Sequence, residues 1–380
     1  MQQELPFFVN TPELLEESLR ILANSSLIAL DTELDSFYSY QDQICLVQIS
    51  TPENDFIFDP LNLDITPLAP LFTEPERTVI FHAGMNDIPH LKHEFCFSFS
   101  NIFDTYIAAG LLNYPRRGLA YLLEKHFNIV LDKQYQRADW RQRPLSPEML
   151  QYARYDTAYL FDLRKELLKE LKNKNRLEAA AYAFKQTAST EFHAKTFDST
   201  GWAKIKGIAN IPRHRYGIVR ELYIWREREA QRLNIQPFRV MPDYTILQLA
   251  SFPPQSEKDL IESATVKHLE TYPHQATGVY SAITAGKRIG AIPFPKPKRR
   301  DRIILSAAEQ QRLHRLKEWR AQTVIKDEIA SEFLLSNSEI FALAQFAPRS
   351  QEELQKSHIL PPHILKNYGE AVIAVLNKAQ

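Results

Sequence analysis

Two segments in the C-terminal half of the chain repeat each other without a gap. Residues 225–260 align with residues 319–354 at a shift of 94, and ten of the 36 aligned positions are identical. The shared positions are mostly apolar, Trp225 and Trp319 among them, which indicates a common core rather than a common chemistry. Self-similarity at a fixed shift marks a duplicated supersecondary unit. The sequence therefore predicts two small helical domains of the same fold.

The N-terminal 170 residues have a different pattern, in which short β-type runs mix with helical ones. Runs rich in Ile, Val and Phe predict strands over residues 27–33, 44–50, 55–59 and 78–83. Apolar residues at helical spacing predict helices over residues 12–24, 86–95, 104–112, 119–127 and 147–172. Strands followed by mixed strands and helices favour an α/β fold with a mixed sheet.

A segment rich in proline and basic residues separates the two repeats and is typical of an extended linker. We therefore expect an α/β domain over residues 1–200 and a first helical domain over 208–288. The linker follows over 289–303, and a second helical domain occupies 304–380.

The net charge of zero conceals a strong asymmetry along the chain. Residues 1–110 carry 17 acids against three bases, whereas residues 201–320 carry 22 bases against 11 acids. A surface that is merely solvated also carries charge, but an imbalance this large favours a polyanion-binding surface. The basic half is the expected place for such a partner.

The sequence also indicates a compartment. No apolar run approaches the ~20 residues that span a bilayer, and the N-terminus lacks the basic start and apolar block of a signal peptide. The two cysteines, Cys45 and Cys96, lie in apolar stretches, so we expect reduced core thiols rather than a disulfide. The expectation is a cytoplasmic protein without a membrane partner.

Four carboxylates stand at the ends of apolar elements or among large apolar residues. Asp31 and Glu33 end one predicted strand, on the same face of it. Asp87 follows another predicted strand, and Asp156 lies in the helix predicted over residues 147–172. Converging carboxylates repel one another unless divalent cations lie among them, and oxygen ligands suit magnesium or manganese. Tyr152 lies one helical turn before Asp156. Taken alone it is a packed core tyrosine, but beside four carboxylates it can orient an attacking water.

Three segments in order carry a family resemblance. The stretches "LDTELDSFYSY", "FHAGMNDIPHL" and "YARYD" resemble the motifs of the DEDD superfamily of 3′–5′ exonucleases, in its tyrosine branch. Residues 131–160 are especially similar to ribonuclease D, and the paired helical repeats resemble HRDC domains. The resemblance implies a ribonuclease H-like α/β exonuclease domain with a mixed sheet, followed by two all-α HRDC-like bundles.

The same resemblance implies roles for the five motif residues. Asp31, Glu33 and Asp156 would surround the metal that activates water, and Asp31 would bridge to a second metal held by Asp87. Tyr152 would position the nucleophile. The implied enzyme uses two Mg²⁺ or Mn²⁺ ions to remove 5′-mononucleotides from RNA with a single-stranded 3′ end. tRNA precursors are the expected substrates, and a monomer is the expected state.

Two features depart from the family pattern. An aromatic and a basic residue are typical after the Glu of the first ribonuclease D motif, and this chain has Leu34 and Asp35 there. That stretch resembles the wider family that includes the exosome-associated nuclear exonuclease, which leaves the substrate open. The second repeat is acidic, with five bases against seven acids in residues 321–380, so its contact with RNA is also open.

Several further residues are candidates for contact with nucleic acid, each with a structural alternative. Leu34 can wedge against the terminal base or belong to the core, and Phe37 can stack on a base or pack at the strand end. His82 can approach the scissile phosphate, although a histidine that caps the strand end is the more common situation.

Basic residues near the third motif and at the start of the helical half are candidates for phosphate contact. Either Arg141 or Arg143 is expected to lie on a phosphate path, but not both. Lys204 and Lys206 are the corresponding candidates beyond the α/β domain.

The main hypothesis is a metal-dependent 3′–5′ exoribonuclease acting in tRNA maturation or RNA trimming. A 3′–5′ DNA exonuclease is the nearest alternative, because the sequence does not show whether a 2′-hydroxyl is required. A nucleic-acid adaptor with a vestigial nuclease site is a third class, against which the intact carboxylates argue. The acids at the strand ends also argue against a purely structural helical protein.

Overall fold

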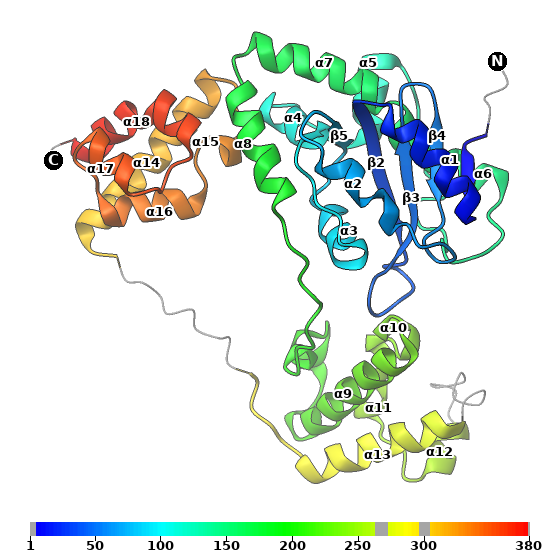
Figure 1. The fold of residues 1–380 in the computed structure, drawn as a ribbon. Helices are drawn as coiled ribbons and strands as arrows, with labels where there is room; N and C mark the ends of the chain where they lie inside the picture. Colours follow the sequence, from blue (N-terminus) through cyan, green and yellow to red (C-terminus); the bar gives the residue numbers. More distant parts are fainter. Residues whose placement is uncertain (1–4, 263–272, 296–304, 379–380) are drawn as a thin grey trace. The chain divides into compact units, whose positions relative to one another are not determined.

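The computed structural model describes residues 5–262, 273–295 and 305–378 (Figure 1). The larger part of the predicted linker, residues 289–303, therefore lies outside the described residues. The chain divides into two compact units. The first comprises residues 1–34, 44–192 and 303–380, and the second comprises residues 35–43 and 193–302.

A six-stranded sheet forms the centre of the first unit. Its strand order is β1-β4-β3-β2-β5-β6, with β1 Phe7–Val9, β2 Leu27–Leu34, β3 Ile44–Ser50, β4 Asp55–Phe58, β5 Thr78–Phe81 and β6 Ile102–Asp104. The β2–β3 and β3–β4 pairs are antiparallel, and the remaining pairs are parallel. The predicted mixed sheet is confirmed, as are its four predicted strands. The sequence analysis missed β1 and β6, which have only three residues each.

Helices cover both sides of this sheet (Figure 1). They are α1 Pro12–Ala23, α2 Ala69–Thr73, α3 Ile88–Phe95, α4 Thr105–Leu111, α5 Leu119–Phe127, α6 Pro147–Ala158, α7 Leu160–Asn173 and α8 Leu177–Ala188. The helix predicted over 147–172 is interrupted at Tyr159, where ψ is 0°. The interruption separates two packing tasks, because α6 lies across β2, β3 and β4 while α7 packs on β5 and α4.

The second unit contains the first helical repeat. Its helices are α9 Tyr216–Leu233, α10 Pro237–Val240, α11 Asp243–Ser251, α12 Glu257–Glu262 and α13 Pro273–Ile289. Buried Trp202, Ile218 and Leu249 belong to its apolar core. Residues 35–43, which join β2 to β3, belong to this unit too. The Gln236 side chain donates to the backbone oxygens of Ser36 and Ser39, at 2.5 and 2.7 Å.

The second repeat has its own core around Leu316, Ile340 and Leu343. Its helices are α14 Ala307–Lys326, α15 Ser331–Leu334, α16 Asn337–Phe346, α17 Gln351–Lys356 and α18 Pro362–Asn377. The shift of 94 found in the sequence brings the starts of α10, α11 and α12 onto the starts of α15, α16 and α17. The predicted duplication is therefore confirmed at the level of individual helices.

The two cysteines are free thiols with different surroundings. Cys45 is buried, as expected, but Cys96 is exposed, so the prediction of a core thiol is wrong for Cys96. Cys96 follows α3 in a left-handed conformation with φ of 55°, where the chain turns at the surface. Among the described residues, none of the helices combines the length and the apolar character that crossing a membrane requires.

Candidate active site

Strand β2 positions the first two carboxylates. Asp31 and Glu33 lie on one face of the strand, opposite Gln48 and Leu46 of β3. The register shifts between Glu33 and Leu34, so regular pairing ends directly after the second carboxylate. Both side chains are half-buried.

A tight turn after β5 positions the third carboxylate, Asp87, at the start of α3. The backbone N–H groups of Ala83 and Gly84 donate to the Asp104 carboxylate at 3.2 and 2.8 Å. A side chain at Gly84 would place its Cβ 2.7 Å from the Phe81 ring, so the turn requires glycine at that position. The Thr32 hydroxyl donates to buried Asp87 at 2.5 Å and fixes its carboxylate beside β2.

Helix α6 brings the fourth carboxylate and the tyrosine to the same place. The helix begins at the N-cap Ser146 and lies across β2, which carries Asp31 and Glu33, and across β3 and β4. The Thr157 hydroxyl lies 2.7 Å from the Ser50 hydroxyl of β3, which fixes the helix against the sheet. Asp156 and Tyr152 are thereby held over the carboxylates of β2.

The four carboxylates influence one another electrostatically. Burial raises the pKa of Asp31 well above its usual range, and the neighbouring charges of Asp87, Asp156 and Glu33 raise it further. The pKa of Glu33 is raised by burial and then by Asp156 and Asp87. Burial also raises the pKa of Asp87 and of Asp156 to about 7, with Asp104 adding to the first and Asp87 to the second.

The donor set of this cluster fits divalent cations. Four carboxylates supply the hard oxygen ligands that Mg²⁺ and Mn²⁺ prefer, and cations would remove the repulsion that raises the pKa values. Among the described residues, no group of three or more His, Cys, Asp or Glu side chains has the geometry of a metal site as it stands. The fit to cations therefore rests on the chemistry of the four carboxylates.

Tyr152 borders both the carboxylates and a cavity. Burial, followed by the charges of Asp156, Glu33 and Asp31, raises its pKa far above the usual value, so the phenol keeps its proton. Its ring packs near Trp140 and Tyr135, with centroids 6.0 and 5.8 Å away. A cavity of about 510 Å³ opens beside it, lined also by Tyr135 and Tyr155.

The residues predicted to stack on or contact the 3′ end have different surroundings. Leu34 is half-buried against the main core of the first unit. Phe37 is 48% exposed and packs near Phe238 of the second unit at 5.8 Å. His82 bonds through Nδ1 to the Thr105 hydroxyl at 2.8 Å, and burial lowers its pKa to about 4. That bond matches the structural alternative considered for His82.

The predicted phosphate contacts also differ in their partners. Arg141 pairs with Asp139 at 2.8 Å. Arg143 bonds Asp59 through Nε and Nη2 at 2.7 and 2.6 Å and also donates to backbone oxygens, so its guanidinium is held within the fold. Lys204 pairs with Asp198 at 2.7 Å, and Lys206 is exposed.

Sequence analysis missed Thr32 and Asp104, which organise the site without being motif carboxylates. Asp104 holds the turn before Asp87 and caps α4 through the N–H groups of Tyr106 and Ile107. A local signal for it existed, because "NIFDTY" ends an apolar run with an acid at a helix start. Thr32 offered no such signal, since its partner is 55 residues away.

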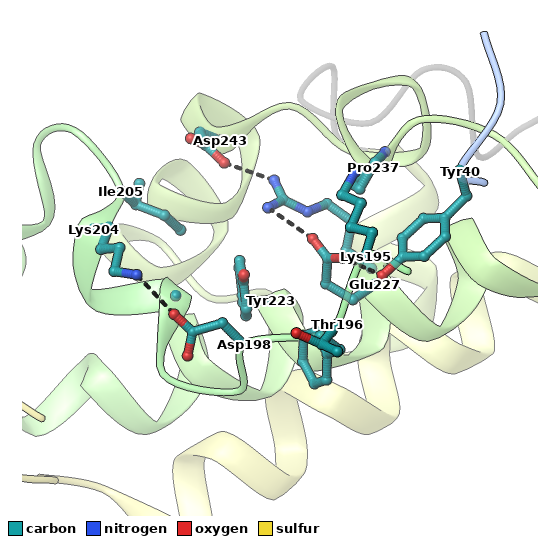
Figure 2. A pocket seen from close by; sticks show the side chains of 13 residues that line it. Tyr40, Lys195, Thr196, Asp198, Lys204, Ile205, Tyr223, Glu227, Pro237 and Asp243 are labelled. Carbon is teal, nitrogen blue, oxygen red and sulfur yellow. Dashed lines mark hydrogen bonds and ion pairs between the residues drawn. The ribbon is translucent and has the colours of Figure 1, made fainter. Parts of the chain in front are cut away.

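A second cluster of charge, around buried Arg226 and Glu227, lines a cavity of about 380 Å³ within the second unit (Figure 2). Arg226 pairs with Asp243 at 2.6 Å and with Glu227 at 3.6 Å. The Tyr40 hydroxyl donates to Glu227 at 3.3 Å, and at the rim Lys204 pairs with Asp198. Here each acid has a base or a donor beside it.

Comparison with known proteins identifies similar domains for three segments of the chain. Residues 6–172 match the family model of 3′–5′ exonucleases, and residues 216–272 and 309–376 match that of HRDC domains. The exosome complex exonuclease RRP6 of Saccharomyces cerevisiae is 35% identical over 66% of this chain and 36% of its own length. Ribonuclease D of Zymomonas mobilis is 34% identical over 63% of this chain and 62% of its own length. The chain thus spans about a third to two thirds of these relatives.

A solved structure extends the likeness to three dimensions. The catalytic core of RRP6 from Trypanosoma brucei matches with a TM-score of 0.67 and 29% identity, over 75% of this chain and 83% of that one. The mixed sheet and the helical repeats agree with these matches in fold. Residues 6–172 therefore form a domain similar to 3′–5′ exonucleases, and two segments similar to HRDC domains follow it.

Proposed function

We propose that the protein is a divalent-metal-dependent 3′–5′ exoribonuclease that releases nucleoside 5′-monophosphates. The observation that carries the proposal is the convergence of Asp31, Glu33, Asp87 and Asp156, whose pKa values are all raised. A buried cluster of like charges is costly to stability, and its position under a tyrosine-bearing helix is what phosphodiester hydrolysis needs. The ribonuclease D and RRP6 relatives support RNA as the substrate.

The proposed roles divide the cluster between two cations. Asp31, Glu33 and Asp156 would hold the first, and Asp31 together with Asp87 would hold the second. When bound, a pair of ions about 4 Å apart supplies an activated water and stabilises the leaving oxygen. Tyr152 keeps its phenol proton and orients the attacking water, while Thr32 holds the Asp87 carboxylate in place.

The RNA body would contact the basic first HRDC domain through phosphates. Lys204, Lys206 and Phe37 are the candidates in that unit, and Leu34, His82 and Arg141 are those near the carboxylates. Arg143 is the weaker of the two arginine candidates, because its guanidinium is held by Asp59 and by backbone oxygens and its side chain is less exposed than that of Arg141. Magnesium or manganese as the ions, tRNA precursors as substrates, a monomeric state and a cytoplasmic location complete the proposal.

The test is digestion of matched oligonucleotides by the full chain after removal of metal with EDTA. With Mg²⁺ or Mn²⁺ restored, we expect RNA with a single-stranded 3′ tail to shorten one nucleotide at a time, yielding 5′-monophosphates. Without metal there should be no product. A DNA oligomer of the same sequence is the control for the sugar, and a panel of tRNA precursors reports the natural end point. Endonucleolytic products, or activity in EDTA, would contradict the proposal.

A further inference from the structure

Gln48 of β3 is a buried polar side chain without a partner. It is 0% exposed, and neither its Nε2 nor its Oε1 atom has a hydrogen-bond partner in the described part of the chain. Burying an amide in that condition is destabilising, because its hydrogen bonds to water are lost and not replaced. An apolar side chain of similar volume would avoid the cost, so the amide calls for an explanation.

The strand register places Gln48 beside the carboxylate cluster. Gln48 pairs directly with Asp31 across β2 and β3, so the two side chains leave the same face of the sheet. Cβ atoms of directly opposed residues are about 4.5–5.5 Å apart. An amide with three side-chain torsions therefore reaches the Asp31 carboxylate by rotation alone, without movement of the backbone.

The neighbours of Gln48 place it under the segment of α6 that carries Asp156. Two residues along the strand, Ser50 contacts Thr157 at 2.7 Å. In the other direction, Leu46 packs in the same cluster as Ala153. Gln48 lies midway between these two contacts and on the same face, so it faces the helix between positions 153 and 157.

We propose that Gln48 is a positioning residue of the active site, whose side-chain amide donates a hydrogen bond to the Asp31 carboxylate in the metal-loaded enzyme. This inference rests on the proposed two-cation site. A carboxylate that binds a metal ion commonly also accepts a hydrogen bond from a neighbouring side chain. That bond fixes the orientation of the oxygen that faces the ion. The unpaired amide then destabilises the metal-free protein. Its hydrogen bond to Asp31 forms when the cations bind.

The test replaces the amide with an apolar chain of similar size, Gln48→Met, in the full chain. We expect metal-free Gln48→Met to unfold at a higher temperature than the wild type, because the unpaired amide is gone. We also expect its Mn²⁺ affinity, measured by calorimetric titration, and its turnover at saturating Mn²⁺ to fall about 10–100-fold. Gln48→Leu serves as the second variant if the methionine does not pack.

Ile57→Met is the matched control, since Ile57 pairs with Gln48 from β4 and packs in the same cluster as Leu46 and Ala153. It changes packing without removing a polar group and should keep Mn²⁺ affinity and turnover. Wild-type Mn²⁺ affinity in Gln48→Met, whatever its stability, would overturn the inference. Failure of the wild type itself to bind Mn²⁺ would instead overturn the proposed function.

Discussion

The two clusters of charge in this protein differ in whether acid is matched by base. In the second unit, Arg226 lies between Asp243 and Glu227, and Tyr40 donates to Glu227. In the first unit, Asp31 and Asp156 stand among other acids, and neither forms an ion pair with a lysine or arginine of the described residues. A matched cluster can stabilise a fold by itself, whereas an unmatched one needs something from outside the chain.

The comparison explains why one cluster suits catalysis and the other suits structure. Burial raises the pKa of Glu227, but Arg226 opposes the shift and keeps the acid paired. The charges of neighbouring acids only add to the shifts at Asp31 and Glu33. Perturbed carboxylates of this second kind cluster at functional sites. Substitutions that break one cluster and leave the other intact should therefore separate catalysis from stability.

The largest expected effect comes from neutralising the unmatched cluster at Asp156. Asp156→Asn should lower turnover about 10³-fold or more, because one ligand of the proposed first cation is lost, while RNA affinity should change little. Turnover on a tailed RNA at saturating Mg²⁺ and RNA binding by fluorescence anisotropy are the measurements. Asp162→Asn is the matched control, since Asp162 is an exposed acid six residues further on. Near-normal turnover by Asp156→Asn would refute the assigned mechanism.

Sequence patterns located most of this site because its acids end regular elements. Asp31 and Glu33 lie at the end of a strand with clear apolar alternation. Asp156 lies among large apolar residues of a predicted helix. The turn before Asp87 was visible as a small-residue step between a strand and a helix. These signals are local, and local signals are what periodicity and turn chemistry carry.

Features set by distant contacts could not be predicted in the same way. The apolar spacing runs unbroken through Tyr159, yet α6 and α7 pack on different strands and the helix is interrupted there. Strands β1 and β6 are too short for an alternation to register. Residues 35–43 lie between two predicted strands and carry no pattern that indicates the unit of the first helical repeat, to which they belong.

Breaking the matched cluster should affect stability rather than chemistry. Arg226→Met leaves buried Glu227 without its base, and the loss of one partner from a buried pair costs up to about 3–5 kcal/mol. Asp243 is exposed and adds little to this cost. Urea unfolding monitored by circular dichroism should show this loss, while Mn²⁺ affinity stays at the wild-type value. The double variant with Glu227→Gln should recover part of the stability. Wild-type stability in Arg226→Met would show that the pair contributes nothing.

A rise in pH should destabilise the metal-free protein through the unmatched cluster, whereas bound metal should stabilise the protein through it. Asp87 and Asp156 have pKa values raised from 3.8 to about 7, so the metal-free native state binds more protons than the unfolded state between these values. Their contribution to stability is complete below about pH 4 and is lost as the pH rises past about 7. The metal-free protein should therefore lose stability over this window, and Asp156→Asn should flatten the loss.

Cations should restore that stability where the carboxylates are ionised. The Mn²⁺ concentration is fixed at 100 times the dissociation constant measured at pH 8. At pH 8 this concentration should raise the melting temperature by about 5–10 °C. At pH 5.5 the same concentration should raise it by clearly less, because protons compete for the same oxygens. Differential scanning calorimetry at both pH values is the measurement. An equal shift at both would contradict the assignment of these acids as ligands.

The smallest expected effects concern the rim of the matched cluster, where Lys204 already has a partner. Its pair with Asp198 is exposed, so Lys204→Ala should change the free energy of unfolding by less than about 1 kcal/mol.

No carboxylate of the described residues lies within ion-pair distance of Lys206. A lysine held by an acid is less available to a phosphate, so Lys206→Ala should weaken RNA binding more than Lys204→Ala. The slope of the logarithm of the RNA-binding constant against the logarithm of the salt concentration should fall in magnitude by about one for Lys206→Ala. Asp198→Ala should release Lys204 and strengthen RNA binding slightly, and anisotropy titrations at several salt concentrations compare all three. Weaker RNA binding by Asp198→Ala would show that the pair itself, rather than the free lysine, shapes the surface.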